Sequence, residues 1–208
     1  MDQLDLALQT AGPLLRRVDQ VISTVGAAPD HRLWAELRRV RLLPGDAVRA
    51  VAALRPAELA EAAPELRADA QAYAGIAASL PGPGGWTGEA AESYQAARRR
   101  AADFLSGAPD SLDERLEATA DLAEALLSWM SETREEVGAA LALALGSTEA
   151  LQLASDAPLD PAANQAATAA ADVGANLLRT IANSYDLATD LLEGSADLAR
   201  AASHVAGR

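Results

Sequence analysis

The stretch Pro81-Gly-Pro-Gly-Gly-Trp-Thr-Gly-Glu-Ala-Ala-Glu-Ser-Tyr94 lies between two of the clearest helical patterns in the chain. Its first five residues stop a helix, because proline lacks the amide donor and glycine has too much backbone freedom. Thr87 is a good N-cap for the helix that follows, and Glu89 falls in its first turn, where the carboxylate complements the exposed amides. Gly88 carries no side chain, so an indole or a neighbouring backbone can come close there. The stretch therefore predicts a helical hairpin with Trp86 at its tip.

Both flanks of this turn carry a helical repeat. Before it, leucine or tyrosine recurs every seven residues and alanine falls four residues later: Leu59, Ala63, Leu66, Ala70, Tyr73, Ala77 and Leu80. Such a seam of alternating large and small side chains suits a close antiparallel neighbour. After the turn, a matching apolar stripe is expected at Ala90, Tyr94, Ala97, Ala101 and Phe104 or Leu105. Pro64 should kink the first of these helices or restart it.

The composition of the whole chain favours helices. Half of its 208 residues are hydrophobic, mostly Ala and Leu, whereas aromatic residues make up only 3%. Ala and Leu lead the helix scale and β-branched residues are sparse, so we predict an all-α fold. We expect long antiparallel helices that form a helical-hairpin or four-helix-bundle architecture. Cores built from alanine are thin, so such helices must pack closely or pair with a partner.

Turn-forming residues divide the chain into three segments. Residues 1–45 form an N-terminal helical segment, whose first helix is expected to break near Gly12-Pro13. Residues 46–108 contain the hairpin. Residues 109–208 form two long helices, and the linker between them ends at Asp160-Pro161, which caps and opens the last helix. We expect these two helices to pack on the hairpin as one domain.

The charge of the chain argues against two classes of partner. At −13, with no lysine, it repels phosphate backbones and anionic lipid headgroups, so we expect neither nucleic-acid nor peripheral membrane binding. The most apolar run, residues 137–145, is too short to span a bilayer, so no membrane insertion is expected. The first five residues are acidic where a Sec signal peptide would be basic. We therefore expect no Sec signal peptide, and a chain that is cytoplasmic before any export and leaves the cell, to be secreted or held at the cell surface, only by another route.

No pattern in the sequence predicts catalysis or a cofactor. The two histidines, His31 and His204, have no second His or acid at ligand spacing, and the lack of Cys excludes thiolate metal sites. Adjacent acids such as Glu135-Glu136 diverge on a helix and do not build a carboxylate dyad. No P-loop, Gly-x-Ser-x-Gly or dinucleotide fingerprint occurs. We therefore predict no catalytic residue, metal site, cofactor or small-molecule ligand, and hence a non-enzymatic protein.

The tripeptide Trp86-Thr-Gly88, in a turn between two amphipathic helices, resembles the signature of the WxG superfamily. These are small helical-hairpin proteins exported by type VII (Esx-type) secretion systems. The longer pattern through Tyr94 is similar to the family's Trp-x-Gly-x-Ala-Ala-x-x-aromatic, and the approach from Leu54 to Leu80 resembles the actinobacterial variants. The resemblance covers residues 46–108. It implies a homo- or heterodimer that forms a four-helix bundle and is recognised by a membrane secretion ATPase.

The family's export signal is a tyrosine followed four residues later by an acid, on a helix near the C-terminus. The corresponding residues here are Tyr185 and Asp190, which are five residues apart, and Thr189 holds the fourth position. Four residues keep two side chains on one helix face, whereas five rotate them apart by more than a third of a turn. The chain departs from the family's pattern at this point.

Two hypotheses follow for the function. The first is a non-enzymatic helical protein of type VII secretion, either an exported substrate or an adaptor, which binds through helix faces with Trp86 and Gly88 at the tip. The alternative is a cytoplasmic scaffold or immunity-type interaction protein that shares only the hairpin geometry, with Trp86 as an ordinary packing residue. An enzyme is the third and least supported hypothesis.

Overall fold

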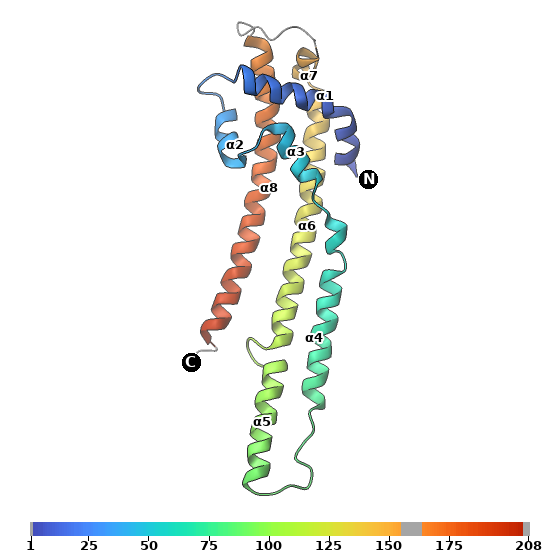
Figure 1. The fold of residues 1–208 in the computed structure, drawn as a ribbon, viewed down its shortest axis with the longest axis vertical. Helices are drawn as coiled ribbons and strands as arrows, with labels where there is room; N and C mark the ends of the chain where they lie inside the picture. The colour runs from blue at the N-terminus through green and yellow to red at the C-terminus, as the bar shows by residue number, and fades with distance from the viewer. Residues whose placement is uncertain (1, 155–163, 206–208) are drawn as a thin grey trace. The chain divides into compact units, whose positions relative to one another are not determined.

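The computed structural model describes residues 2–154 and 164–205, and every regular element in these ranges is helical (Figure 1). The all-α prediction is therefore confirmed. In chain order the elements are α1 (Gln3–Thr24), α2 (Leu33–Val40), α3 (Pro44–Ala52), the 3-10 turn η1 (Pro56–Leu59), α4 (Ala62–Ser79), α5 (Glu89–Leu105), α6 (Leu112–Leu145), α7 (Thr148–Leu153) and α8 (Asn164–Val205). The predicted cap and opening residues of the last helix, Asp160 and Pro161, lie outside the described residues.

The chain divides into two compact units, and each is assembled from separate stretches of sequence. Unit 1 comprises residues 1–55 and 129–188, and unit 2 comprises residues 56–128 and 189–208. Helices α6 and α8 each contribute residues to both units. Unit 1 extends past the predicted segment boundary at residue 46, and unit 2 extends past the one at residue 109. A boundary that falls within a helix leaves no proline, glycine or charge signal in the sequence.

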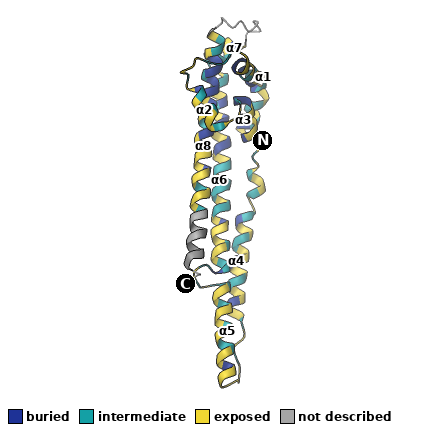
Figure 2. Ribbon diagram, turned by 60° about the vertical axis from the view of Figure 1, so that its left-hand side comes forward, coloured by how far each residue is buried: buried dark blue, intermediate teal, exposed yellow. Residues whose placement is uncertain are grey.

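Unit 1 contains the apolar core of the molecule. Branched aliphatic side chains from α1, α2, α3, α6, α7 and α8 are buried together there (dark blue in Figure 2). The largest of the fully buried side chains are Leu4, Leu15, Leu33, Leu141, Leu177, Leu178 and Ile181. Burying each of them contributes roughly 1.5–3 kcal/mol, so hydrophobic packing is the main force that holds this unit together.

Helix α1 continues through Pro13, so the predicted break near Gly12-Pro13 is wrong. Proline inside a helix costs about 3 kcal/mol. The helix buries Ala11 on one side of this position and Leu15 and Val18 on the other, and α1 packs against α3 and α7. The packing of these side chains outweighs the local cost of the proline.

Unit 2 contains α4 and α5, which run antiparallel, pack against each other and are joined by residues 80–88 (Figure 1). The predicted seam on α4 is confirmed: Ala63, Ala70 and Ala77 are buried, and the leucine and tyrosine positions between them are half-buried. Pro64 lies in the first turn of α4, where its missing amide is tolerated, so the chain restarts a helix there.

The stripe predicted for α5 is wrong at four positions. Ala90, Ala97, Ala101 and Phe104 are exposed, whereas Tyr94 and Leu105 are half-buried, and Ala91 is the buried side chain instead. The reason is two hydrogen bonds to the end of α4, which set the rotation of α5. The Tyr94 hydroxyl donates to Pro81 O (2.9 Å), and Arg98 Nη1 donates to Leu80 O (3.1 Å). Polar anchors, rather than the apolar stripe, decide which face of α5 turns inward.

Candidate functional site

The tip between α4 and α5 is an ordered turn. The Trp86 amide donates to Pro83 O (3.2 Å), and the Trp86 ring meets the Tyr94 ring edge-on, with centroids 5.8 Å apart. Tyr94 is in turn tied to the turn backbone through its hydroxyl. The structure thus brings Trp86 and Tyr94 into contact, and Gly88 lies between them in the sequence.

Gly88 is the N-cap of α5, with φ 83° and ψ −167° and no side-chain cap, so the predicted cap at Thr87 is wrong. Glycine adopts this backbone conformation at little cost, whereas other residues are strained in it. A Cβ added at Gly88 would meet nothing within 4 Å. No group therefore occupies the space that the missing side chain leaves, and glycine serves here for its backbone freedom.

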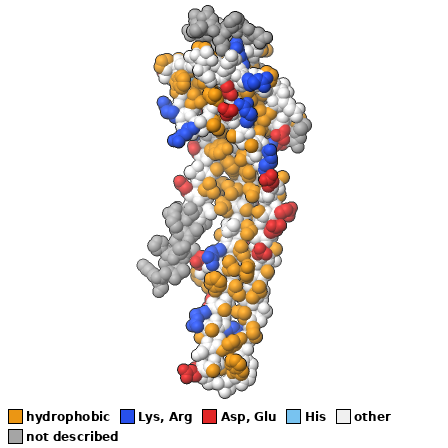
Figure 3. Space-filling model, in the orientation of Figure 1, with side chains coloured by type: hydrophobic (Ala, Val, Ile, Leu, Met, Phe, Trp, Pro, Cys, Tyr) orange, Lys and Arg blue, Asp and Glu red, His pale blue; other side chains and the backbone are white. Residues whose placement is uncertain are grey.

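Large apolar side chains of unit 2 are exposed at the tip and along α4 and α5. Trp86 is 65% exposed, Phe104 61% and Ile76 48%. Figure 3 shows hydrophobic side chains gathered over α4 and α5 on the face in view. Exposed patches of this kind mark protein interaction sites more often than they mark catalytic ones. We call the exposed α5 residues Ala90, Ala97, Ala101 and Phe104 the α5 stripe.

The structure does not bring Tyr185 and Asp190 together on one face. Both lie on α8, where five residues correspond to a rotation of about 140°. Tyr185 belongs to unit 1, and its ring packs edge-on against Trp129 with centroids 5.5 Å apart. The Trp129 indole donates to Ser184 O (2.6 Å), which fixes this aromatic pair to α8. Asp190 belongs to unit 2 and is exposed.

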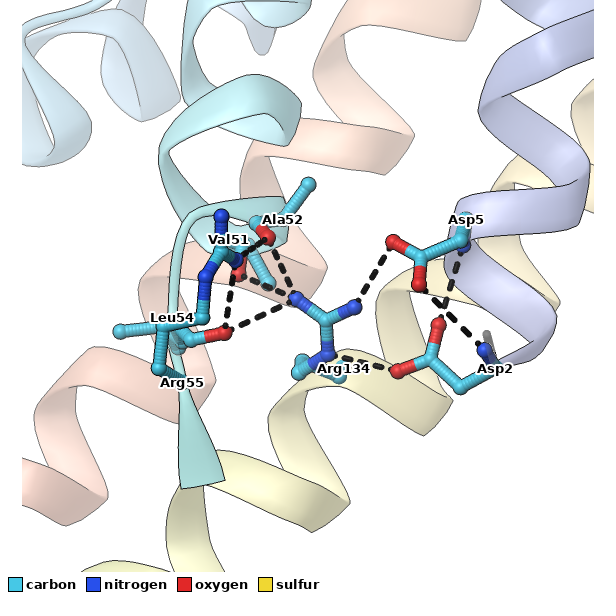
Figure 4. A network of polar contacts seen from close by, with 7 residues as sticks. All are labelled: Asp2, Asp5, Val51, Ala52, Leu54, Arg55 and Arg134. Atoms are coloured by element: carbon cyan, nitrogen blue, oxygen red, sulfur yellow. Dashed lines mark hydrogen bonds and ion pairs between the residues drawn. The ribbon is translucent and has the colours of Figure 1, made fainter. Parts of the chain in front are cut away.

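A buried arginine that the sequence reasoning missed organises part of unit 1 (Figure 4). Arg134 on α6 pairs with Asp2 (2.6 Å) and Asp5 (2.9 Å) at the start of α1. It also donates to Ala52 O (2.6 Å) and Leu54 O (3.1 Å) after α3. Asp2 and Asp5 form the capping box of α1, and these hydrogen bonds hold their carboxylates in the positions from which they pair with the guanidinium. In the sequence, the signal for this contact is the pair of acids within the first five residues, which needs a cation nearby.

These contacts shift the ionisation of their members. The hydrogen bond from Arg134 holds the pKa of Asp2 below its usual range, and the same bond raises the pKa of Arg134. Burial raises the pKa of Asp19, although its carboxylate accepts a hydrogen bond from the Gly45 amide (2.9 Å). The Arg134–Asp2 contact joins α6 to the start of α1, and the Asp19–Gly45 contact joins α1 to the start of α3. Both contacts have a structural role.

The histidine that the structure describes in full is also accounted for structurally. The Leu33 amide donates to His31 Nδ1 (3.1 Å) at the start of α2, and His31 Nε2 lies 3.4 Å from Asp172. The side chain of His204 lies outside the described residues. Within residues 2–154 and 165–195, whose side chains the structure describes, no three His, Asp or Glu are grouped to hold a metal ion. None of the helices in these ranges combines the length and apolarity needed to cross a bilayer.

Comparisons of this chain with protein-family models, with curated proteins and with solved structures gave no match.

Proposed function

We propose that this chain is a non-enzymatic helical protein of type VII secretion, an exported substrate or a substrate adaptor, that acts by binding other proteins through helix faces. Two independent features support the proposal. One is the resemblance of residues 46–108, and of Trp86-Thr-Gly88 in particular, to the WxG superfamily. The other is the α5 stripe, which presents apolar side chains to solvent.

The α5 stripe is the observation that carries the proposal. Its members recur at spacings of seven, four and three residues along α5, and the exposed Trp86 precedes them. A solvent-facing helix surface is normally polar, whereas an apolar stripe at this spacing is typical of a helix that packs against another helix. Inside unit 2, α5 buries only Ala91 among its hydrophobic side chains. Most of its apolar surface is therefore available to a partner.

The partner that fits this surface is another helical hairpin, either a second copy of the chain or a related protein. In this arrangement α4 and α5 supply two helices of a four-helix bundle. Alanines on the α5 stripe allow two helix axes to approach closely, and Phe104 adds one large side chain. The tip with Trp86 is left as the surface that a secretion ATPase contacts.

Matched substitutions on α5 test the binding surface. Ala97→Glu and Ala96→Glu introduce the same side chain at adjacent exposed positions, but only Ala97 belongs to the α5 stripe. We expect Ala97→Glu and Phe104→Glu to abolish the complex in light-scattering measurements on the purified chain or on co-purified pairs. Ala96→Glu should preserve it. Equal behaviour of Ala97→Glu and Ala96→Glu, with helicity unchanged, would contradict the proposed surface.

A secretion assay tests the association with export. The chain should be found in culture filtrate and should disappear from it when the secretion ATPase is deleted. Trp86→Ala should prevent export while circular dichroism retains the helical signal. Export that is independent of the ATPase would contradict the proposal.

A specific observation favours the alternative, a cytoplasmic scaffold or immunity-type protein. Tyr185 and Asp190 have the wrong spacing for one helix face, and Tyr185 packs on Trp129 in unit 1. If the chain stays in the cytoplasm but Ala97→Glu still disrupts a complex, the alternative holds and the α5 stripe keeps its binding role.

A further inference from the structure

A second hollow surface of unit 2 lies between α6 and α8 and is separate from the α5 stripe. It is a groove of about 960 Å³. The residues that line it are Asp110, Glu114, Arg115, Glu117, Ala118, Thr119, Asp121, Leu122 and Ala125 near the start of α6, and Asp190, Leu191, Gly194 and Ser195 on α8. We call it the α6–α8 groove.

The apolar part of the groove is made of two leucines among small residues. Leu122 and Leu191 are half-buried and face the hollow from the two helices, while Ala118 and Ala125 leave space beside them. A Cβ added at Gly194 would meet nothing within 4 Å, so the α8 side is open at this point. Side chains of leucine size fit against such a surface, and burying them there favours binding.

The rim of the groove is strongly acidic. It carries five carboxylates against a single lining arginine, Arg115, which is 3.7 Å from Asp110. Arg67 on α4 adds a second cation, bonded to Asp121 (2.8 Å) and 3.6 Å from Glu117. Asp121 and Asp190 remain exposed, so the rim keeps a net negative charge and attracts a cationic ligand.

We propose that the α6–α8 groove binds an amphipathic helix of a partner protein whose apolar stripe is flanked by arginine or lysine. The apolar side chains of such a helix cover Leu122 and Leu191, and its cations meet the acidic rim. The acidic rim selects a helix rich in arginine or lysine, whereas this chain carries 30 Asp and Glu against 17 Arg, so a partner of opposite charge fits the groove better than a second copy does. This inference does not depend on the proposed function, which concerns α5.

Fluorescence anisotropy with the full chain tests the groove. The probe is a labelled, capped peptide of about 18 residues, made of Ala, Leu and Arg so that an apolar stripe lies between arginines. A second peptide carries glutamate in place of each arginine. The arginine peptide should bind, more weakly as the salt rises from about 50 to about 300 mM, and the glutamate peptide should not.

Variants locate the binding. Leu122→Glu and Leu191→Glu should weaken binding by about tenfold or more, since each places a charge on the apolar surface. Ala118→Met, which fills the groove without adding charge, should also weaken it and covers the case in which a glutamate variant unfolds. Binding that is unaffected by Ala118→Met and by the folded glutamate variants would overturn the proposal.

Two double variants, each lacking two negative charges, distinguish binding in the α6–α8 groove from general attraction to an acidic protein. The double variant Asp121→Asn with Asp190→Asn removes two charges at the groove, and Asp30→Asn with Glu135→Gln removes two exposed charges in unit 1. The groove pair should weaken binding several-fold and reduce its salt dependence, whereas the unit 1 pair should leave the dissociation constant unchanged. Equal losses in the two pairs, or no binding at all, would overturn the proposal.

Discussion

In unit 1 the buried side chains are mainly leucine, valine and isoleucine, supplied by six helices. In the described part of unit 2 the hydrophobic side chains that are buried are Ala63, Ala70, Ala77, Ala91 and Ala120. Unit 1 buries many more side chains than the described part of unit 2, and most of them are larger than alanine. Since an alanine removes about one methyl group from water and a leucine several times as much, unit 1 buries far more apolar surface.

Polar contacts follow the same division. In unit 1, Arg134 satisfies the carboxylates and carbonyls around it (Figure 4). In unit 2, the buried Gln95 Oε1 and Arg98 Nε have no hydrogen-bond partner among the residues that the structure describes. A buried polar atom without a partner costs about 1–3 kcal/mol. Unit 1 is thus stabilised by its own packing, whereas the α4–α5 pair is held by weaker contacts and keeps its larger apolar side chains for solvent or a partner.

The largest expected effect contrasts core truncations in the two units. Leu178→Ala in unit 1 should lower the free energy of unfolding by about 3 kcal/mol, because the fully buried leucine leaves a cavity. Ala70→Gly in unit 2 should cost only about 1 kcal/mol, mainly through helix propensity. Urea unfolding followed by circular dichroism measures both. Similar losses for the two variants would break the contrast between the units.

Next in size is the removal of the guanidinium in unit 1. Arg134→Met keeps an apolar stem of similar length but leaves the carbonyls after α3 without a donor, so it should lower the free energy of unfolding by about 2 kcal/mol. Arg134→Lys retains the charge and should recover part of the loss. A neutral outcome for Arg134→Met in urea unfolding would show that water satisfies these groups and that packing alone holds unit 1.

A smaller effect is expected at the tip of unit 2. Gly88→Ala should destabilise by about 1 kcal/mol through its positive φ, since the added Cβ meets no neighbouring atom. Gly85→Ala is the matched control, with no neighbour within 4 Å and no positive φ. Hydrogen exchange of the α5 amides reports the difference. Equal protection in the two variants would show that backbone strain at position 88 does not destabilise the tip.

The smallest effect is the pH dependence of the Arg134 network. The folded-state pKa of Asp2 lies below its unfolded value, so the stability that Asp2 contributes is present above about pH 4 and is lost as the pH falls through the folded pKa. Asp2→Asn keeps an N-cap acceptor but should lose this contribution at pH 7, and the gap between variant and parent should close in acid. Urea midpoints measured across pH 2–7 check this, and a gap that is constant over this range would exclude the ion pair as its cause.

Asp19 gives the opposite sign in the same experiment. Its folded-state pKa is raised by burial, so the folded state binds more protons and gains stability as the pH falls through that pKa. Asp19→Asn should therefore lack this gain. Identical pH profiles for the Asp2 and Asp19 variants would contradict both assignments.

Much of the fold could be predicted from the local sequence of each helix. The all-α class, the turn around Trp86 and the buried alanines of α4 follow from helix propensity, helix-breaking residues and a period of seven. The prediction for α5 failed because an apolar pattern does not distinguish an alanine that packs against another helix from one that faces solvent, as Ala97 and Ala101 do. The hydrogen bonds of Tyr94 and Arg98, which decide the rotation, depend on where α4 ends.

By itself, the sequence determined which segments are helical and where the chain turns, because those properties depend on neighbouring residues. Only the tertiary structure decided that α1 runs through Pro13, that Arg134 joins Asp2 to the end of α3, and that α6 and α8 serve both units. Each of these depends on contacts between residues far apart in the chain, and no local pattern encodes such contacts. The turn at Trp86 was local and could be predicted, whereas the exposure of the α5 stripe beside it was not.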